Sequence, residues 1–142
     1  MKNFTTRLAF PVLVAFFVIF SVSNSYAFNS CQCTTYAKCA TGLNITGDGK
    51  DWDNNAGSKN KVGSTPIVGG AMNFEKGAYG ADSNHGHVGK VMSYKSDGSY
   101  WKVTVRHANW STKFSNCGCD NVSEKEFRVK KGDSQVHYIT KK

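Results

Sequence analysis

Hydrophobic and polar positions divide the chain into a short apolar start and a longer mixed region. An unbroken apolar run over 8–20 follows Lys2 and Arg7, and small and polar residues then lead to Ala27. This order is typical of a secretory signal peptide. A transmembrane helix needs about 20 apolar residues, and this run is shorter and contains a proline. We therefore expect cleavage after Ala27, leaving 28–142 as one domain.

The first part of that domain predicts one clear helix. Residues 33–40 contain neither glycine nor proline, and Gly42 stands where a C-terminal cap would. A second, shorter helix is expected over 52–58. The surrounding stretch, 47–64, is rich in Gly, Asn and Asp and is typical of a loop.

The second half reads as strands joined by turns. Runs rich in β-branched and aromatic residues predict strands at 70–74, 88–94, 100–107 and 135–139. Between the second and third strands, the Ser-Asp-Gly-Ser sequence at 96–99 predicts a hairpin turn. A helix followed by hairpin-linked strands predicts an α+β domain with an antiparallel sheet.

The charge balance is basic. The chain has 18 lysines and arginines against 10 acids. Loss of the signal peptide would leave 16 basic residues and the same 10 acids, a net charge of about +6. This balance suits an anionic cell-envelope surface, although spaced lysines that only keep the protein soluble explain it equally well. The pattern of lysines and aromatics that marks a nucleic-acid groove is missing from the sequence, so we expect no nucleic-acid partner.

Five cysteines follow the predicted signal peptide. They are Cys31, Cys33, Cys39, Cys117 and Cys119. Cysteines of an exported protein pair, and an odd number leaves one thiol over. Pairs separated by a single residue are too tight to close comfortably, so bridges from the N-terminal cluster to the C-terminal pair are favoured, with the pairing left open.

Cys33 is the candidate for the unpaired, reactive thiol. It begins the predicted helix, where backbone N–H groups and the helix dipole stabilise a thiolate, whereas Cys39 lies inside the helix. His87 begins a predicted strand and is the candidate general base. If the hairpin is antiparallel about 96–99, His87 lies beside residues 107–109, so Asn109 could accept a hydrogen bond from its ring.

Three motifs together resemble the CHAP family of cysteine, histidine-dependent amidohydrolases and peptidases. They are Gln32-Cys33-Thr34-Thr35-Tyr36-Ala37, Gly86-His87-Val88 and His107-Ala108-Asn109-Trp110. The resemblance implies a papain-like α+β fold, with short N-terminal helices packed on the sheet, and cleavage of peptidoglycan amide bonds. A cysteine-containing C-terminal extension would follow.

The same resemblance implies roles for single residues. Cys33 would be the nucleophile, His87 the base and then the acid, and Asn109 the orienting residue. Gln32 and the Cys33 backbone N–H are candidate oxyanion donors. His107 stands where many members carry an acid, so it could assist or replace Asn109.

Metal binding is the less favoured interpretation. The set His85, His87 and His107 would suit zinc, but it leaves Cys33 and Asn109 unexplained. The Asp48, Asp51 and Asp53 group lacks the spacing of a calcium loop. We expect no metal and no cofactor.

The sequence therefore predicts a periplasmic or secreted cysteine hydrolase acting on peptidoglycan or its peptide fragments, with no membrane span after signal cleavage. The alternative is a non-catalytic, disulfide-stapled binding or inhibitor protein of the cell envelope with the same fold. A zinc hydrolase is the third possibility. The number and position of unpaired thiols separate the first two.

Overall fold

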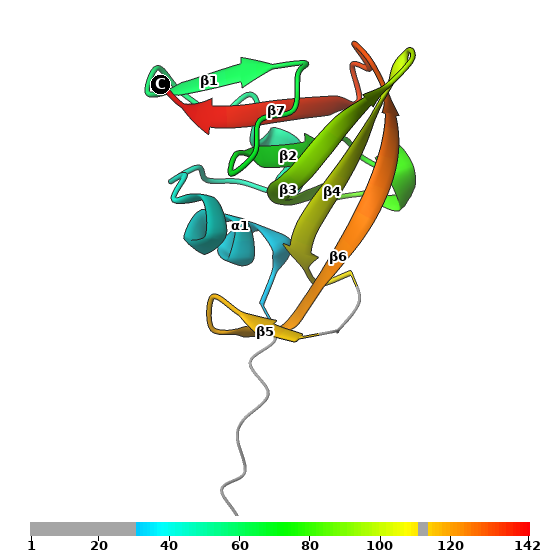
Figure 1. Ribbon diagram of the computed structural model, residues 1–142. Coiled ribbons are helices and arrows are strands. Elements are labelled where there is room, and N and C mark those ends of the chain that lie inside the picture. The colour runs from blue at the N-terminus through cyan, green and yellow to red at the C-terminus, as the bar shows by residue number, and fades with distance from the viewer. Residues whose placement is uncertain (1–30, 111–113) are drawn as a thin grey trace, which may run out of the picture.

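An antiparallel β-sheet is the framework of the computed structural model, which describes residues 31–110 and 114–142. The predicted signal peptide lies outside the described residues. Seven strands pair in the order β1-β7-β2-β3-β4-β6-β5 (Figure 1). The strands are β1 (Asn60–Gly63), β2 (Ala71–Phe74), β3 (His87–Asp97), β4 (Tyr100–Ala108), β5 (Phe114–Asn116), β6 (Cys119–Lys130) and β7 (Val136–Lys141).

Helix α1 (Cys33–Thr41) begins where the sequence predicted and ends one residue later. Gly42 adopts a left-handed conformation with φ 68° and donates its backbone N–H to the carbonyl of Lys38, which ends the helix. The second predicted helix, over 52–58, is wrong. That segment forms turns after the 3₁₀ helix η1 (Gly49–Asp51), because its Asn and Gly residues favour turns over helix. The sequence predicted more than one short N-terminal helix, but the described residues contain one α-helix, α1.

All four predicted strands are present, at slightly different bounds, as β2, β3, β4 and β7. The predicted hairpin turn joins β3 to β4, and its pairing shifts at a bulge between Val91 and Ser93. Strands β1, β5 and β6 were not predicted. The long β6 was missed because its second half alternates charged residues with Phe127 and Val129. These two side chains form a buried face only when β4 pairs beside them.

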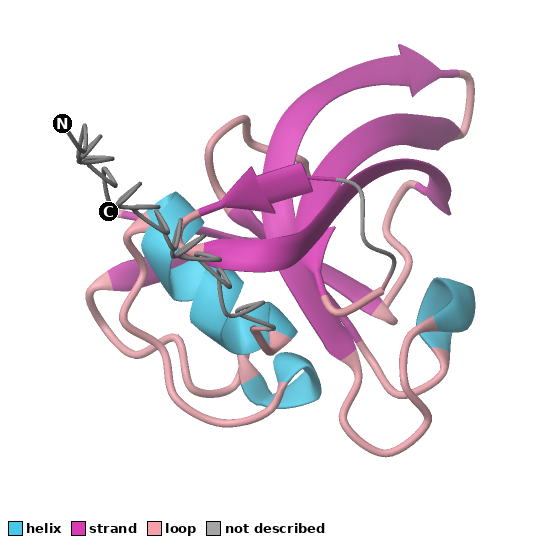
Figure 2. Ribbon diagram, turned by 90° about the horizontal axis from the view of Figure 1, so that it is seen from below, coloured by secondary structure: helices cyan, strands magenta, loops and turns pink. Residues whose placement is uncertain are grey.

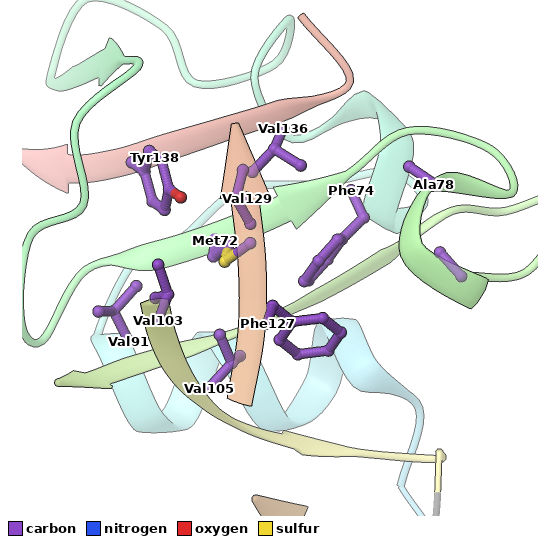
Figure 3. Close-up of a cluster of buried hydrophobic side chains, with 11 residues drawn as sticks. Met72, Phe74, Ala78, Val91, Val103, Val105, Phe127, Val129, Val136 and Tyr138 are labelled. Carbon is purple, nitrogen blue, oxygen red and sulfur yellow. The ribbon is translucent and has the colours of Figure 1, made fainter. Parts of the chain in front are cut away.

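The two faces of the sheet bury different cores. One face curls around a cluster in which Met72, Phe74 and Phe127 lie close to one another, as Figure 3 shows. The other face is covered by α1 (Figure 2) and buries Trp52, Ala37 and their neighbours. Side chains alternate between the faces along each strand, so neighbouring residues of β2 and β7 face opposite cores. No described helix is long and apolar enough to cross a membrane.

Two disulfides tie α1 and the residues before it to the β5–β6 hairpin. Cys31 pairs with Cys119 and Cys39 pairs with Cys117, with Cα–Cα distances of 5.3 and 5.9 Å. These are bridges from the N-terminal cluster to the C-terminal pair, as the sequence favoured. The side chain of Asn121 adds two hydrogen bonds to the backbone of Cys31, at 3.0 and 2.9 Å. Covalent and hydrogen bonds therefore fix the chain just before α1, at Cys31, and a second crosslink fixes the helix itself, at Cys39.

Candidate active site

Cys33 is the first residue of α1 and the cysteine that both disulfides leave unpaired. Backbone N–H groups of Val88, Thr34 and Cys33 itself hydrogen-bond its sulfur and favour the thiolate. Burial acts in the opposite direction and is the larger effect, so the pKa of the Cys33 thiol is raised. Cys33 begins the helix and is unpaired, as the sequence predicted, but burial opposes the thiolate that a helix start would favour.

His87 is the first residue of β3, and only 5% of its surface is exposed. The loop that carries η1 packs directly against its main chain. A Cβ atom added at Gly49 would lie 2.6–2.7 Å from backbone atoms of His87, closer than packed carbon atoms approach. The backbone N–H of Lys50 also donates to the carbonyl of His85 at 3.0 Å. A glycine at position 49 therefore lets this loop support the strand end that bears His87.

His107, on the neighbouring strand β4, is the hydrogen-bond partner of the His87 ring. Nε2 of His87 lies 3.1 Å from Nδ1 of His107. If Nε2 of His87 donates, its Nδ1 keeps a lone pair that can accept a proton from Cys33. His107 then carries its own proton on Nε2, which is buried and has no hydrogen-bond partner among the described residues. In either tautomer this buried Nε2 lacks a partner within the described part of the chain, which carries an energetic cost.

Burial and a nearby cation keep both rings neutral. The pKa of His87 is lowered to about 3, first by burial and then by the charges of His107 and Lys125. The pKa of His107 is lowered to about 4, again by burial first and then by Lys125. Trp110 packs edge-on against both rings, at 4.7 and 5.0 Å between centroids, and the Lys125 ammonium lies 4.5 Å from the Trp110 ring centre. Sequence reasoning missed Lys125, because its strand was not predicted.

Asn109 does not contact His87 in the way the sequence suggested. Its Nδ2 donates to Oε1 of Gln32 at 2.9 Å, and its backbone has a left-handed φ of 62°. Strand β4 ends at Ala108, so the backbone turns at Asn109 and carries the amide toward the start of α1. The expected hydrogen bond between His87 and Asn109 is therefore wrong, and His107 occupies that place.

A cleft of about 300 Å³ brings the sequence-selected residues to one surface. Gln32, Cys33, His87 and Asn109 all line it, together with Trp110 and the 80–86 loop. A neighbouring hollow shares Cys33 and is bordered by Thr34, Asp48 and His85. Both hollows therefore open onto Cys33.

The zinc set considered from sequence is not assembled. His85 is exposed, and its Nδ1 lies 3.9 Å from Asp48 and 4.0 Å from Asp82 rather than beside the two buried rings. Asp51 accepts the backbone N–H of Asp48 at 3.2 Å, as in a capping box at the start of η1. Among the described residues, the one group of metal-ligand type lies elsewhere, at Asp53, Glu75 and His137.

Three comparisons place these residues among known proteins. A family model described as the CHAP domain matches residues 21–109. A Staphylococcus aureus protein named as N-acetylmuramoyl-L-alanine amidase domain-containing protein is 39% identical over 85 residues, covering 55% of this chain and 14% of that protein. A crystal structure of N-acetylmuramoyl-L-alanine amidase from Staphylococcus aureus is similar with a TM-score of 0.54 and 29% identity, covering 78% of this chain and 31% of that one. The chain thus spans less than a third of either protein's length.

Proposed function

The chain belongs to the CHAP domain family, and from this premise we propose that it is an exported cysteine hydrolase of peptidoglycan amide bonds. The bond is either the one between N-acetylmuramic acid and L-alanine or one within the stem peptide. The observation that carries the proposal is an unpaired thiol in one cleft with a buried neutral imidazole, itself hydrogen-bonded to a second ring. The names of the two amidase relatives support the substrate class.

The reaction starts from a neutral thiol and a neutral imidazole. Because burial raises the pKa of Cys33 and lowers that of His87, the proton rests on sulfur and moves to His87 Nδ1 as sulfur attacks the carbonyl carbon. His107 is the orienting residue in place of Asn109, because its Nδ1 accepts a hydrogen bond from the Nε2–H of His87.

Backbone donors at the start of α1 suit the charge that develops on the substrate oxygen. The first N–H groups of a helix have no intrahelical partner, and Cys33 supplies one of them. Gln32 uses its oxygen to accept from Asn109, so its Nε2 hydrogens point away from that contact and can donate to the oxyanion. His87 then protonates the leaving amine, and water hydrolyses the thioester with His87 as base.

Lysis of purified sacculi tests the proposal. We expect Cys33→Ser and His87→Ala to abolish lysis while thermal unfolding changes little, and mass spectrometry of released muropeptides to identify the bond. The unfolded, unreduced protein should contain one free thiol, mapped to Cys33. Full lysis by either variant would refute the mechanism. Zero free thiols, or a free cysteine elsewhere, would favour the non-catalytic envelope-binding alternative.

A further inference from the structure

Three side chains of metal-ligand type meet on the face of the sheet covered by η1 and α1. Asp53, Glu75 and His137 each offer one oxygen or nitrogen, and these atoms all lie within 4.8 Å of one another. Nε2 of His137 is 3.5 Å from a carboxylate oxygen of Asp53. None of the three lines either hollow beside Cys33. The group is therefore separate from the candidate active site.

Strand pairing fixes this arrangement. Asn73 of β2 lies directly opposite His137 of β7, so their side chains share a face. Glu75 follows Asn73 by two residues, and its N–H still bonds the carbonyl of Gln135, which keeps it on the same face. Asp53 comes from the turn after η1, anchored by the fully buried Trp52. His137 thus lies in a strand, Glu75 directly after one and Asp53 in a turn beside them.

Asn73 adds a buried amide beside the three side chains. It is fully buried, its Nδ2 makes only long contacts to the Gly49 carbonyl (3.4 Å) and Asp53 (3.5 Å), and its Oδ1 has no partner. Buried amide oxygens are rarely left without a partner. A half-turn of the amide would point Oδ1 at Asp53 and the Gly49 carbonyl, an arrangement of oxygens that is favourable only around a cation.

The local charge also favours a cation. The carboxylate oxygens of Asp53 and Glu75 lie within 4.8 Å of each other, and both side chains are partly buried. Partly buried carboxylates in this proximity repel each other, and a bound cation removes that repulsion.

We propose that this group binds one divalent transition-metal cation, with zinc as the best match, through Asp53, Glu75 and His137. Asn73 Oδ1 supplies a fourth ligand. One imidazole with oxygen ligands suits zinc, whereas calcium and magnesium prefer oxygen alone. The ion would join the turn after η1 to β2 and β7. Since Gly49 of that same loop packs on the His87 backbone, the ion would act as a structural support behind the cleft.

Zinc uptake by the protein carrying Cys33→Ser tests this, because the substitution removes the thiol that could bind zinc in the cleft. After incubation with Zn²⁺ and desalting, we expect one zinc per chain and a higher melting temperature than in EDTA. His137→Gln and Glu75→Gln should each weaken binding at least about tenfold, the range seen when a ligand shell is disturbed. His85→Gln, which alters an exposed histidine beside the cleft, is the matched control and should bind like its parent.

Absence of zinc uptake at millimolar Zn²⁺ would overturn the proposal, as would equal uptake by the parent and by both ligand variants. Equal stabilisation by Ca²⁺ would overturn the assignment to zinc. Melting in EDTA shows whether each variant folds. If His137→Gln does not fold, Asp53→Asn decides, with retained binding counting against the site. Lysis of sacculi is not a readout, so failure here leaves the proposed hydrolase untouched.

Discussion

The Nε2 atom of His87 and the Nδ1 atom of His107 lie 3.1 Å apart, so two imidazoles stand where a thiol hydrolase needs a base and its orienting partner. A second imidazole can donate or accept at this contact, whereas a carboxylate can only accept. The pair therefore has two tautomers, of which the one with the proton on His87 Nε2 leaves Nδ1 unprotonated, as the proposed base role requires.

Replacing His107 tests the orienting role directly. We expect His107→Ala to lower kcat/KM for a muropeptide substrate by about 100-fold to 10,000-fold, the range for loss of base orientation. His107→Glu should retain at least about a tenth of the activity, because a carboxylate accepts from His87 Nε2 and fixes the productive tautomer. Near-normal activity in His107→Ala would remove His107 from the mechanism.

Asn109 should matter much less than His107. Its amide bonds Gln32 rather than His87, so we expect Asn109→Ala to reduce kcat/KM by about tenfold at most, the effect of one neutral hydrogen bond. Asn109→Gly tests the backbone separately, because glycine adopts the observed left-handed φ without strain. A loss in Asn109→Ala as large as in His107→Ala would restore Asn109 as the orienting residue.

The pH dependence of the histidines should depend on Lys125. Its charge disfavours the protonated form of both rings and lowers their pKa values. Lys125→Glu should therefore raise both pKa values, and the acid limb of kcat/KM, which requires neutral His87, should move to higher pH. NMR titration of the ring protons measures this directly. Lys130→Glu, an exposed change on the same strand, should leave both titrations unaltered.

In the wild-type protein, the lowered histidine pKa values predict that kcat/KM changes little with pH on the acid side. With a pKa of about 3, His87 stays neutral as the pH falls from 7 to about 5, whereas a histidine with the ordinary pKa of about 6.5 would lose its base form. A wild-type acid limb near pH 6.5 would contradict this assignment of the resting charge state.

Gly49→Ala should damage both the fold and the site. The added methyl group would lie 2.6–2.7 Å from the His87 backbone, so we expect a loss of about 1–3 kcal/mol in unfolding free energy and reduced activity. Urea denaturation and sacculus lysis measure the two effects. Gly63→Ala is the matched control, since no atom lies within 4 Å of its added Cβ. Wild-type stability in Gly49→Ala would show that the loop moves away from the His87 backbone without a cost in free energy.

The disulfides should account for a large share of stability. Cys39 and Cys117 are 78 residues apart, and closing a loop of that length stabilises the folded state by about 4 kcal/mol in the chain-entropy model. Replacing both with serine should lower the urea midpoint accordingly, whereas Cys33→Ser, which breaks no bridge, should not. Equal midpoints for the two proteins would show that packing alone holds α1.

Local signals were enough to predict the elements that carry the site. Gly42 ended α1, the Asp-Gly turn joined β3 to β4, and the position of Cys33 at a helix start followed from the same pattern. The ring partner of His87, which is His107 rather than Asn109, could not be predicted so closely. A bulge after Val91 shifts the β3–β4 register, and the left-handed backbone at Asn109 redirects its amide, and neither feature has a clear signal in the sequence.

Longer-range features were beyond the sequence for a different reason. The second half of β6 is charged on alternate residues, and only its pairing with β4 over nine residues makes that pattern a strand. Lys125 beside the histidines, and Asp53 beside His137, are juxtapositions of residues far apart in the chain. Such contacts follow from topology rather than from local preference.

The two crosslinks around α1 also determine when the site can form. Cysteines remain reduced inside most cells and oxidise after export. If the chain is the exported wall hydrolase proposed above, the helix that bears Cys33 is held by packing alone until export, and both crosslinks then close around a thiol that stays unpaired. This order of events would complete the site only in the compartment where the wall lies.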